Sequence, residues 1–453
     1  MTARRHRRAR YTARELVAGD PMFDVIIVGG RPAGASLACR LAQRGLRVLV
    51  VDKASFPSHP EVPCCPIMYA SAVQLLDEIH FDEAKYAAAA TRIRKGVVGF
   101  EHYFQATIRV PMTWGRDYLY GFDRAAFDRA LWDHLASFPS ITARAGFVVA
   151  DLLRDASGRV CGIEGGVQGG PRERLHARLA VVGADGRHSL VARRAGAAVV
   201  EQQAQHTSTI HFAEWEGVAP VCDDGEPALH IVSTGRGKNV LFFPSSDGRV
   251  SVATHVRADR ANVAGDAEAY YASQLRGLPS VERRLAGARR TGPLLGVRRI
   301  ANRYREVGGP GWILVGDALH HKDPIDGQGI RDALVSAREL AALLGELHDG
   351  RVPWQTVLAR YRTRVMDETY PMYQSTMKRL VRDLYSDLPP LMIRTLVRWT
   401  LQDPEYQRRF LLFLTRSIAP SEFRTPGLML GLMARGASKD LLSLVRRERW
   451  GTT

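Results

Sequence analysis

The feature that most constrains the fold is a run of strand, glycine-rich turn, helix and second strand within residues 23–53. Val25 to Val28 is a short, continuous run of β-branched residues, which is typical of a strand buried on both faces. The spacing over Ala35 to Arg44 predicts a helix that Gly45 ends, and Leu46 to Val51 repeats the strand pattern. This βαβ unit predicts an α/β fold with a Rossmann-type domain and a mostly parallel sheet.

The turn between the first strand and the helix is suited to a pyrophosphate. Glycines let backbone amides approach phosphates, and a helix N-terminus offers partial positive charge to them. Asp52 follows the second strand, where a carboxylate can accept both hydroxyls of a ribose. The unit therefore predicts dinucleotide binding. The residues that we expect to contact the dinucleotide are Gly29, Gly30, Arg31, Ala33, Gly34, Asp52 and Lys53.

Arg31 departs from the glycine fingerprint of such turns. The third position of GxGxxG is normally glycine, because a glycine there permits close approach of the backbone to the pyrophosphate. Two interpretations of Arg31 are open. Its guanidinium could lie on the phosphates, or it could point into solvent.

Two later segments repeat the pattern of a buried strand followed by a polar turn. The strand predicted over 179–182 ends in a Gly-Ala-Asp-Gly sequence that contains Asp185. The strand predicted over 313–315 ends in Gly-Asp-Ala, with Asp317, and the proline- and glycine-rich turn 323–330 precedes another helix. Because aspartate after a strand is also a good helix cap, each aspartate has a purely structural interpretation as well.

In their order and spacing, the three motifs resemble those of the group A flavoprotein monooxygenases, the p-hydroxybenzoate hydroxylase-like superfamily, which is related to geranylgeranyl reductases and flavin halogenases. The resemblance covers roughly residues 22–350. It implies FAD as cofactor and NAD(P)H as co-substrate. It also implies hydroxylation of an aromatic or polyketide-like small molecule with O2, through a flavin C4a-hydroperoxide in a dry cavity.

The resemblance also implies a role for each later motif in FAD binding. Asp185 belongs to the motif that serves FAD and NAD(P)H, and Asp317 would accept a hydrogen bond from a ribityl hydroxyl. Residues 327–330 would place backbone amides beside the flavin N1–C2=O edge, where reduced flavin is negative. Arg124 would contact the cofactor, although it also suits a helical pair with Asp128. The predicted contacts from these segments are Arg124, Asp185, Gly316, Asp317, Pro324, Gly327, Gly329 and Ile330.

The motifs and the texture of the chain between them divide the sequence into seven segments. Alternating apolar residues and turns predict a substrate domain, an antiparallel β-sheet inserted into the FAD-binding domain. The C-terminal helical region could be a lid over an apolar substrate, a dimer surface, a membrane-surface contact or a layer packed on the FAD-binding domain. The segments are a disordered basic arm (1–21), the FAD-binding domain (22–95, 121–200 and 296–350), the substrate domain (96–120 and 201–295) and the C-terminal helical region (351–453).

Three short sequences are candidates for the substrate side of the site. One of the adjacent histidines at 320–321 could face the flavin as acid–base equipment. The adjacent cysteines at 64–65 lie where related enzymes approach the substrate. The alternative is that they are simply two small, buried apolar residues. The Phe-Phe-Pro sequence at 242–244 resembles a family element near the flavin re face, but it also suits an ordinary core strand.

The residues leave several functions open, and they identify no catalytic residue and no metal site. A reductase of isoprenoid double bonds, similar to geranylgeranyl reductases, is the first alternative. A flavin halogenase is the second, since Lys95 lies about where that family keeps its catalytic lysine, although the WxWxIP element is absent. A flavin-binding protein without enzymatic activity is the third.

Composition limits the partners and the compartment. The net charge of +16 would attract nucleic acid or an anionic membrane, but no nucleic-acid module is visible, so free arginine use is the simpler interpretation. No apolar run approaches the roughly 18 residues of a membrane span, which leaves only peripheral membrane contact open. Five cysteines without metal-like spacing favour a reducing cytoplasm. We therefore expect a cytoplasmic enzyme whose partner is a small apolar or aromatic substrate.

Overall fold

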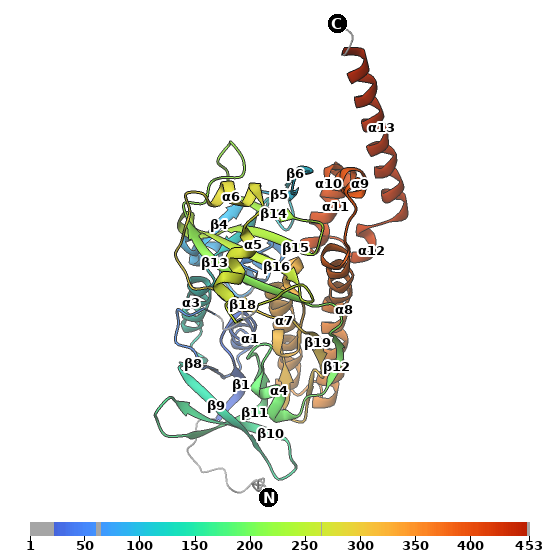
Figure 1. Cartoon of the computed structure of the whole chain (residues 1–453). Helices are drawn as coiled ribbons and strands as arrows, with labels where there is room; N and C mark the ends of the chain where they lie inside the picture. The colour runs from blue at the N-terminus through green and yellow to red at the C-terminus, as the bar shows by residue number, and fades with distance from the viewer. Residues whose placement is uncertain (1–21, 60–64, 264, 451–453) are drawn as a thin grey trace, which may run out of the picture.

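The computed structural model describes residues 22–59, 65–263 and 265–450 of the 453-residue chain, with side chains described up to residue 443 (Figure 1). The predicted basic arm, residues 1–21, and Cys64 lie outside the described residues.

The first large sheet contains the βαβ unit at its centre. Five of its strands, β1, β2, β8, β11 and β21, run parallel, and β20 is antiparallel at one edge. A hairpin, visible at the lower end of Figure 1, extends the sheet from β11. The mostly parallel Rossmann-type sheet is therefore confirmed. Its strand order is β20 (Gly308–Gly309), β21 (Trp312–Leu314), β11 (Glu173–Gly183), β1 (Met22–Val28), β2 (Val48–Asp52) and β8 (Ile141–Ala145), with the hairpin β9 (Phe147–Arg154) and β10 (Val160–Val167).

Two helices that follow the sequence motifs pack against each other on this sheet. Helix α1 (Pro32–Ala42) begins three residues before its predicted start, because proline is favoured at the first helical position. Helix α7 (Gly329–His348) follows the proline- and glycine-rich turn and contacts α1 along its length. Both helices bury their apolar faces in the core that also contains β1 and β2.

The second large sheet is the predicted substrate sheet. Its strands come from the two expected segments, and its pairs are antiparallel except for one. That exception is β5 against β14, which run parallel because the chain enters β5 long before it reaches β14, so no hairpin joins them. The order is β17 (Arg289–Arg290), β13 (Ser208–Glu216), β16 (Val250–Arg257), β15 (Lys238–Pro244), β14 (Ala228–Ser233), β5 (Lys95–Phe100) and β6 (Phe104–Arg109), with β18 (Leu295–Val297) on β13.

Two small sheets lie beside the large ones. One contains β3, β7 and β4, and the other contains β12, β19 and β22. Both are antiparallel, and the second includes the predicted histidine pair in β22. Their strands are β3 (Ile67–Met68), β4 (Ala90–Ile93), β7 (Leu119–Phe122), β12 (Val199–Gln203), β19 (Asn302–Arg305) and β22 (His320–His321).

The C-terminal region is helical, as predicted. Helix α8 packs on α7, and helices α10 and α11 contact β6 of the substrate sheet, so the region covers both layers. Helix α13 extends away from the body (Figure 1). The remaining α-helices are α2 (Ala70–Asp77), α3 (Arg124–His134), α4 (Leu190–Ala195), α5 (Ala267–Leu275), α6 (Pro279–Leu285), α8 (Trp354–Leu380), α9 (Pro390–Met392), α10 (Arg398–Gln402), α11 (Pro404–Leu414), α12 (Pro420–Phe423) and α13 (Pro426–Trp450).

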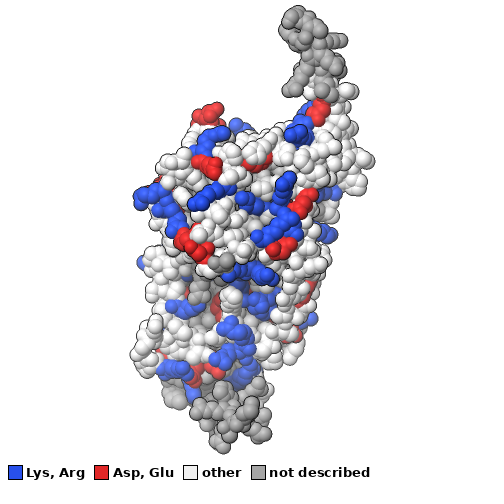
Figure 2. All heavy atoms as spheres, in the orientation of Figure 1, with Lys and Arg blue, Asp and Glu red and all other residues white. Residues whose placement is uncertain are grey.

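The face of the molecule shown in Figure 2 carries many Lys and Arg side chains with Asp and Glu among them. Surface arginines of the described residues include paired ones, such as Arg257 with Asp259 at 2.8 Å. The mixture shows no continuous basic stripe on this face, the footprint that nucleic-acid binding leaves. Within the described ranges, no helix has the length and apolarity needed to cross a membrane.

Gly121 provides a test of how closely strand β7 packs against strand β15. Strand β7 lies so close to β15 that a Cβ atom on Gly121 would stand 1.8 Å from the carbonyl oxygen of Pro244. We predict that Gly121→Ala lowers the free energy of unfolding by about 1–3 kcal/mol, because backbone has to move to admit the methyl group. Urea unfolding measures the change. The matched control is Gly287→Ala, whose Cβ would meet nothing within 4 Å; equal losses in both variants would contradict the close packing.

Candidate active site

Glycines bring the three motif segments together at the carboxyl edge of the parallel sheet. Gly29 has φ +107°, and a Cβ on it would stand 2.4 Å from the carbonyl oxygen of Ala184. A Cβ on Gly34 would stand 1.8 Å from the oxygen of Gly29, and one on Gly316 would stand 2.9 Å from the Cβ of Ala33. Since any side chain would separate these segments, the glycines fix the N-terminus of α1 against both later motifs.

Asp52 is anchored beside the glycine turn. Its Oδ2 accepts a hydrogen bond from the backbone N–H of Gly30 at 2.7 Å, and its Oδ1 accepts one from Ala54 at 2.8 Å. The carboxylate is therefore fixed at the end of β2, next to the glycine turn, while the neighbouring Lys53 is exposed. Ribose binding by Asp52 stays a prediction, and this position agrees with it.

The guanidinium of Arg31 follows neither of the two interpretations that the sequence left open. It donates to the carboxylate of Asp128 and to the carbonyl oxygen of Ser58, and it lies 5.3 Å from the ring centre of Phe56. Its backbone is extended, with φ −83°, so this position does not require glycine. Arg31 thus leaves the turn open by pairing sideways with helix α3.

Asp128 balances two arginines. Its side chain is fully buried, and its second oxygen accepts from Nε of Arg124 at 2.8 Å. Arg124 therefore makes the helical pair that was its alternative interpretation, and its contact with the cofactor stays a prediction. Two guanidinium groups thus share one buried carboxylate beside the glycine turn.

Asp185 and Asp317 have different surroundings. Asp185 accepts from the Ser189 hydroxyl at 2.5 Å and from the backbone N–H of Leu190 at 2.7 Å, which are the capping contacts of α4. Asp317 is accessible to solvent although protein surrounds it. Burial raises the pKa of Asp317, and the charge of Arg187 opposes that rise.

The site fits a large anionic dinucleotide. Helices α1 and α7 both begin without a side-chain cap, so their first backbone N–H groups have no partner inside the helix. Nε of Arg187, close to Asp317, is buried with no hydrogen-bond partner among the described residues. Unpartnered donors at helix N-termini and at an arginine are what a pyrophosphate requires.

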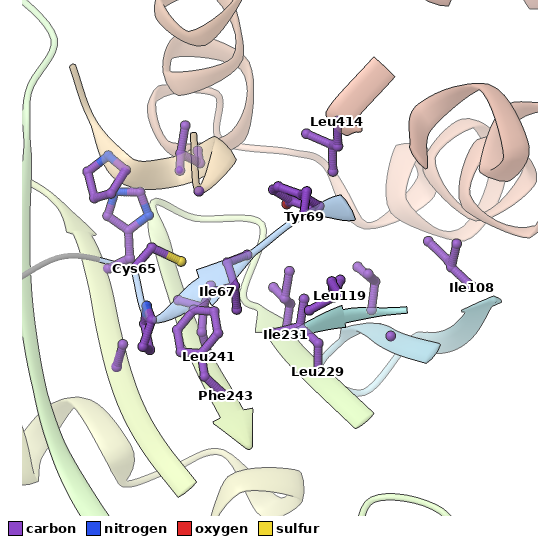
Figure 3. Close-up of a pocket in the computed structure, with 18 of the residues that line it drawn as sticks. Cys65, Ile67, Tyr69, Ile108, Leu119, Leu229, Ile231, Leu241, Phe243 and Leu414 are labelled. Carbon is purple, nitrogen blue, oxygen red and sulfur yellow. The ribbon is translucent and has the colours of Figure 1, made fainter. Parts of the chain in front are cut away.

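An apolar cavity adjoins this site. It lies between the substrate sheet, helix α11 and the turn at 324–327. Figure 3 shows Leu229, Ile231 and Leu241 rising from the sheet toward Leu414 on the opposite side. The lining residues are Cys65, Pro66, Ile67, Tyr69, Gly96, Val98, Ile108, Val110, Leu119, Ile210, Phe212, Leu229, Ile231, Leu241, Phe243, Ala253, His255, Pro324, Ile325, Gly327, Arg379, Phe410, Leu411 and Leu414.

Few polar side chains line the cavity, and the charged one is neutralised. Arg379 of α8 donates to Asp326 and, at 2.9 Å, to Asp383. Burial raises the pKa of the Tyr69 hydroxyl, which therefore stays protonated. His255 is the remaining titratable nitrogen group in the lining. Such a cavity favours an apolar or aromatic guest that carries few polar groups.

The turn that the sequence assigns to the flavin forms one wall of the cavity. Pro324 and Gly327 line the cavity directly. Gly327 has φ +63°, and a Cβ on it would stand 2.8 Å from Cδ1 of Ile67. Helix α7 begins at Gly329, followed by the buried Ile330. The predicted cofactor turn and the cavity are therefore adjacent.

Two smaller sequence predictions, the histidine pair and the Phe-Phe-Pro sequence, can be compared with the structure. His320 stacks on Tyr304, with ring centres 4.5 Å apart. Burial lowers the pKa of the neighbouring His321 to about 2, so its ring is neutral. Phe243 lines the cavity, whereas Phe242 packs in the core on the other face of the sheet. Phe242 thus has the core role that was one interpretation of the Phe-Phe-Pro sequence, and a place for Phe243 near the flavin stays a prediction.

Lys95 lies away from the cavity. Along β5 its neighbours Gly96 and Val98 line the cavity, and alternation places Lys95 on the other face of the strand. Its ammonium group pairs with Asp224 and, at 3.3 Å, with Glu226. This position does not suit the catalytic lysine of a halogenase.

Cys65, the described residue of the candidate pair at 64–65, lines the cavity.

The sequence analysis missed three cavity residues: Tyr69, His255 and Arg379. His255 had a signal, because it is a polar residue at an inward position of the alternating strand β16. The other two had none, since Tyr69 precedes α2 and Arg379 lies near the end of the long helix α8. Only the folded chain brings them to the turn.

Comparisons with known proteins agree with this geometry. The model of a family described as an FAD binding domain matches residues 22–367. A ubiquinone hydroxylase, UbiL, of Rhodospirillum rubrum is 29% identical over 396 residues, covering 83% of this chain and 84% of that protein. A menaquinone reductase of Mycolicibacterium smegmatis is 27% identical over 356 residues, covering 75% of this chain and 81% of that protein.

Solved structures show the same fold. The flavin-dependent brominase Bmp2 superposes with a TM-score of 0.75 at 18% identity, covering 92% of this chain and all of that one. A geranylgeranyl bacteriochlorophyll reductase-like protein of Thermoplasma acidophilum superposes with a TM-score of 0.68 at 16% identity, covering 94% of this chain and all of that one. At these identities the likeness extends to the fold alone.

Asp128 provides a test of the charge cluster. We predict that Asp128→Ala lowers the free energy of unfolding by about 3–5 kcal/mol, because it leaves Arg31 and Arg124 without their shared buried carboxylate. Urea unfolding measures the loss. The control on the same helix is Asp133→Ala, which breaks an exposed pair with Arg129 and should cost about 0.5 kcal/mol. Similar losses in the two variants would show that the cluster does not hold this region.

Proposed function

This chain belongs to the FAD binding domain family of the group A flavoprotein monooxygenases, and we propose that it is an NAD(P)H-dependent hydroxylase of an aromatic or polyketide-like small molecule. Members of the family are FAD-dependent oxidoreductases. The observation that supports the hydroxylase most is the apolar cavity that adjoins the turn at 324–327.

The residues that would hold FAD occupy one continuous edge of the parallel sheet. Gly29 and Gly34 would leave room for the pyrophosphate, the fixed carboxylate of Asp52 would bind the ribose, and the exposed Asp317 would accept a hydrogen bond from the ribityl chain. The N-terminus of α7 at Gly329 would direct backbone amides at the flavin edge. Bound there, FAD would supply redox chemistry between a nicotinamide nucleotide and O2.

The cavity residues would orient the substrate and exclude water. Leu229 and Ile231 of the sheet and Leu414 of α11 provide apolar contact on opposite sides of a flat guest (Figure 3). Exclusion of water from the cavity protects reactive intermediates from hydrolysis. Arg379 holds Asp326 and with it the shape of the turn beside the guest. These side chains bind and position the guest, and none is placed as a nucleophile.

The names of two relatives also support an aromatic substrate. Two have names that refer to quinones, ubiquinone and menaquinone. A ring with an apolar chain would match a cavity whose walls are almost entirely apolar and whose polar groups are close to the turn. We propose an aromatic substrate with an apolar substituent.

Reduction of an isoprenoid double bond is the second candidate. The scarcity of polar groups in the cavity favours it, because an isoprenoid chain needs no hydrogen-bonding partners. Halogenation has less support, since Lys95 lies on the face of the sheet opposite the cavity. Oxygen dependence separates the two leading candidates: hydroxylation consumes O2, and reduction proceeds without it.

We predict that the purified protein is yellow, contains FAD and oxidises NADH or NADPH faster when an aromatic substrate is added. The expected stimulation is at least about tenfold, since substrate-free oxidation would waste the nucleotide. Absorbance of the nucleotide and an oxygen electrode measure the two reactants, and mass spectrometry identifies a product heavier by one oxygen atom.

The matched pair of variants for this assay is Leu229→Trp and Val200→Trp. The first fills part of the cavity and should lower turnover at least about tenfold with unchanged FAD content, whereas the second lies exposed on β12 and should have no effect. Turnover without O2, using a reduced-flavin donor and an isoprenoid, would replace the hydroxylase by the reductase. Absence of FAD from the folded protein would contradict both.

A further inference from the structure

The turn beside the cavity contains a buried carboxylate with an unusual set of partners. Asp323 is 1% exposed, and its Oδ2 accepts a hydrogen bond from the hydroxyl of Ser208. Its Oδ1 accepts from the backbone N–H of Ile325 at 3.0 Å and lies 3.2 Å from Nε2 of His255. The backbone N–H of Asp323 donates to Oδ1 of Asn302 at 2.6 Å. Three groups therefore surround this carboxylate, and Asn302 holds the backbone that carries it.

The surroundings of Asp323 keep it ionised. Burial alone raises its pKa, but attraction to His255 when that ring is protonated, together with the hydrogen bonds from Ser208 and Ile325, brings the pKa below its ordinary value. A buried carboxylate without a compensating cation is costly. Among the groups in direct contact with Asp323, the imidazole is the one that can supply a positive charge by taking up a proton.

His255 faces in two directions. It lines the apolar cavity together with Ile210, the residue opposite it on β13, and it touches Asp323 through Nε2. Since Nε2 lies against the carboxylate, Nδ1 is the ring nitrogen that a molecule in the cavity would meet. The imidazole therefore connects the cavity to a fixed negative charge next to Pro324, on the turn assigned to the flavin.

We propose that His255 is the group that binds and deprotonates a hydroxyl of the substrate, with Asp323 as its positioning residue. The proton of the substrate O–H moves to Nδ1 of His255, the electron pair of that bond stays on the substrate oxygen, and Asp323 compensates the imidazolium. No oxidant or reductant takes part in this step. The inference rests on the proposed function, because it supposes a hydroxyl-bearing aromatic substrate.

The step has a chemical purpose in that function. A phenolate ring is richer in electrons than the neutral phenol, so it reacts more readily with an electrophilic oxygen. The other titratable groups of the cavity serve this purpose poorly: Arg379 is already paired with Asp326 and Asp383, and Tyr69 and Cys65 are acids rather than bases. His255 is thus the base that the cavity offers.

The test uses the full-length, FAD-loaded protein and 4-nitrophenol, whose neutral and ionised forms have different visible spectra. Difference spectra over a range of pH, with the spectrum of the protein subtracted, give the ionisation equilibrium of the bound phenol. We expect binding to wild type to shift this equilibrium at least about tenfold toward the phenolate. His255→Gln should abolish the shift, and Asp323→Asn should reduce it severalfold while the phenol still binds.

His211 offers a matched control. It is a buried histidine on the neighbouring strand β13, on the face away from the cavity, so His211→Gln should leave the equilibrium of the bound phenol unchanged. FAD content and the unfolding temperature identify any variant that fails to fold, and His255→Asn then replaces His255→Gln.

Three results would overturn the proposal: wild-type protein that does not bind the phenol, wild-type protein that binds it in the neutral form, and His255→Gln protein that retains the full shift. The readout needs neither NAD(P)H nor O2. A bound phenolate without any stimulated NAD(P)H oxidation would therefore uphold the role of His255 while rejecting the hydroxylase.

Discussion

The close approach of backbone segments at the carboxyl edge of the parallel sheet is the constraint on which the site depends. Gly29 meets the segment at Ala184, Gly34 meets Gly29, and Gly316 meets Ala33, each at a distance that excludes a Cβ atom. These contacts join three motifs that are far apart in the sequence. They place two helix N-termini, those of α1 and α7, at one edge, where they can serve the two ends of one cofactor.

Buried carboxylates fasten the elements around that edge. Asp128 joins α3 to the glycine turn through Arg31. Asp326 joins the turn at 323–327 to α8, and Asp323 joins the same turn to the substrate sheet. Each carboxylate is compensated by groups from another element, because an uncompensated buried charge would be costly. The compensated carboxylates thus support both the candidate site and the fold. The walls of the cavity can therefore remain apolar.

The sequence predicts the frame well because its signals are local. A buried strand followed by glycines, as at 25–34, can be predicted from those residues alone, and the order of the three motifs indicates the family. Arg31 pairs with Asp128, 97 positions away, and His255 lies against Asp323, about 70 positions away, so no local pattern contains these contacts. Asp128 looks like half of an ordinary helical pair until the fold brings Arg31 to it.

The most direct measurement of the central claim is a crystal structure of the protein with FAD. The account predicts the pyrophosphate at Gly29–Gly34, an adenosine ribose on Asp52, and the flavin ring beside 327–330 with one face open to the apolar cavity. A pyrophosphate displaced from the glycine turn by Arg31, or a flavin ring that does not border the cavity, would contradict it.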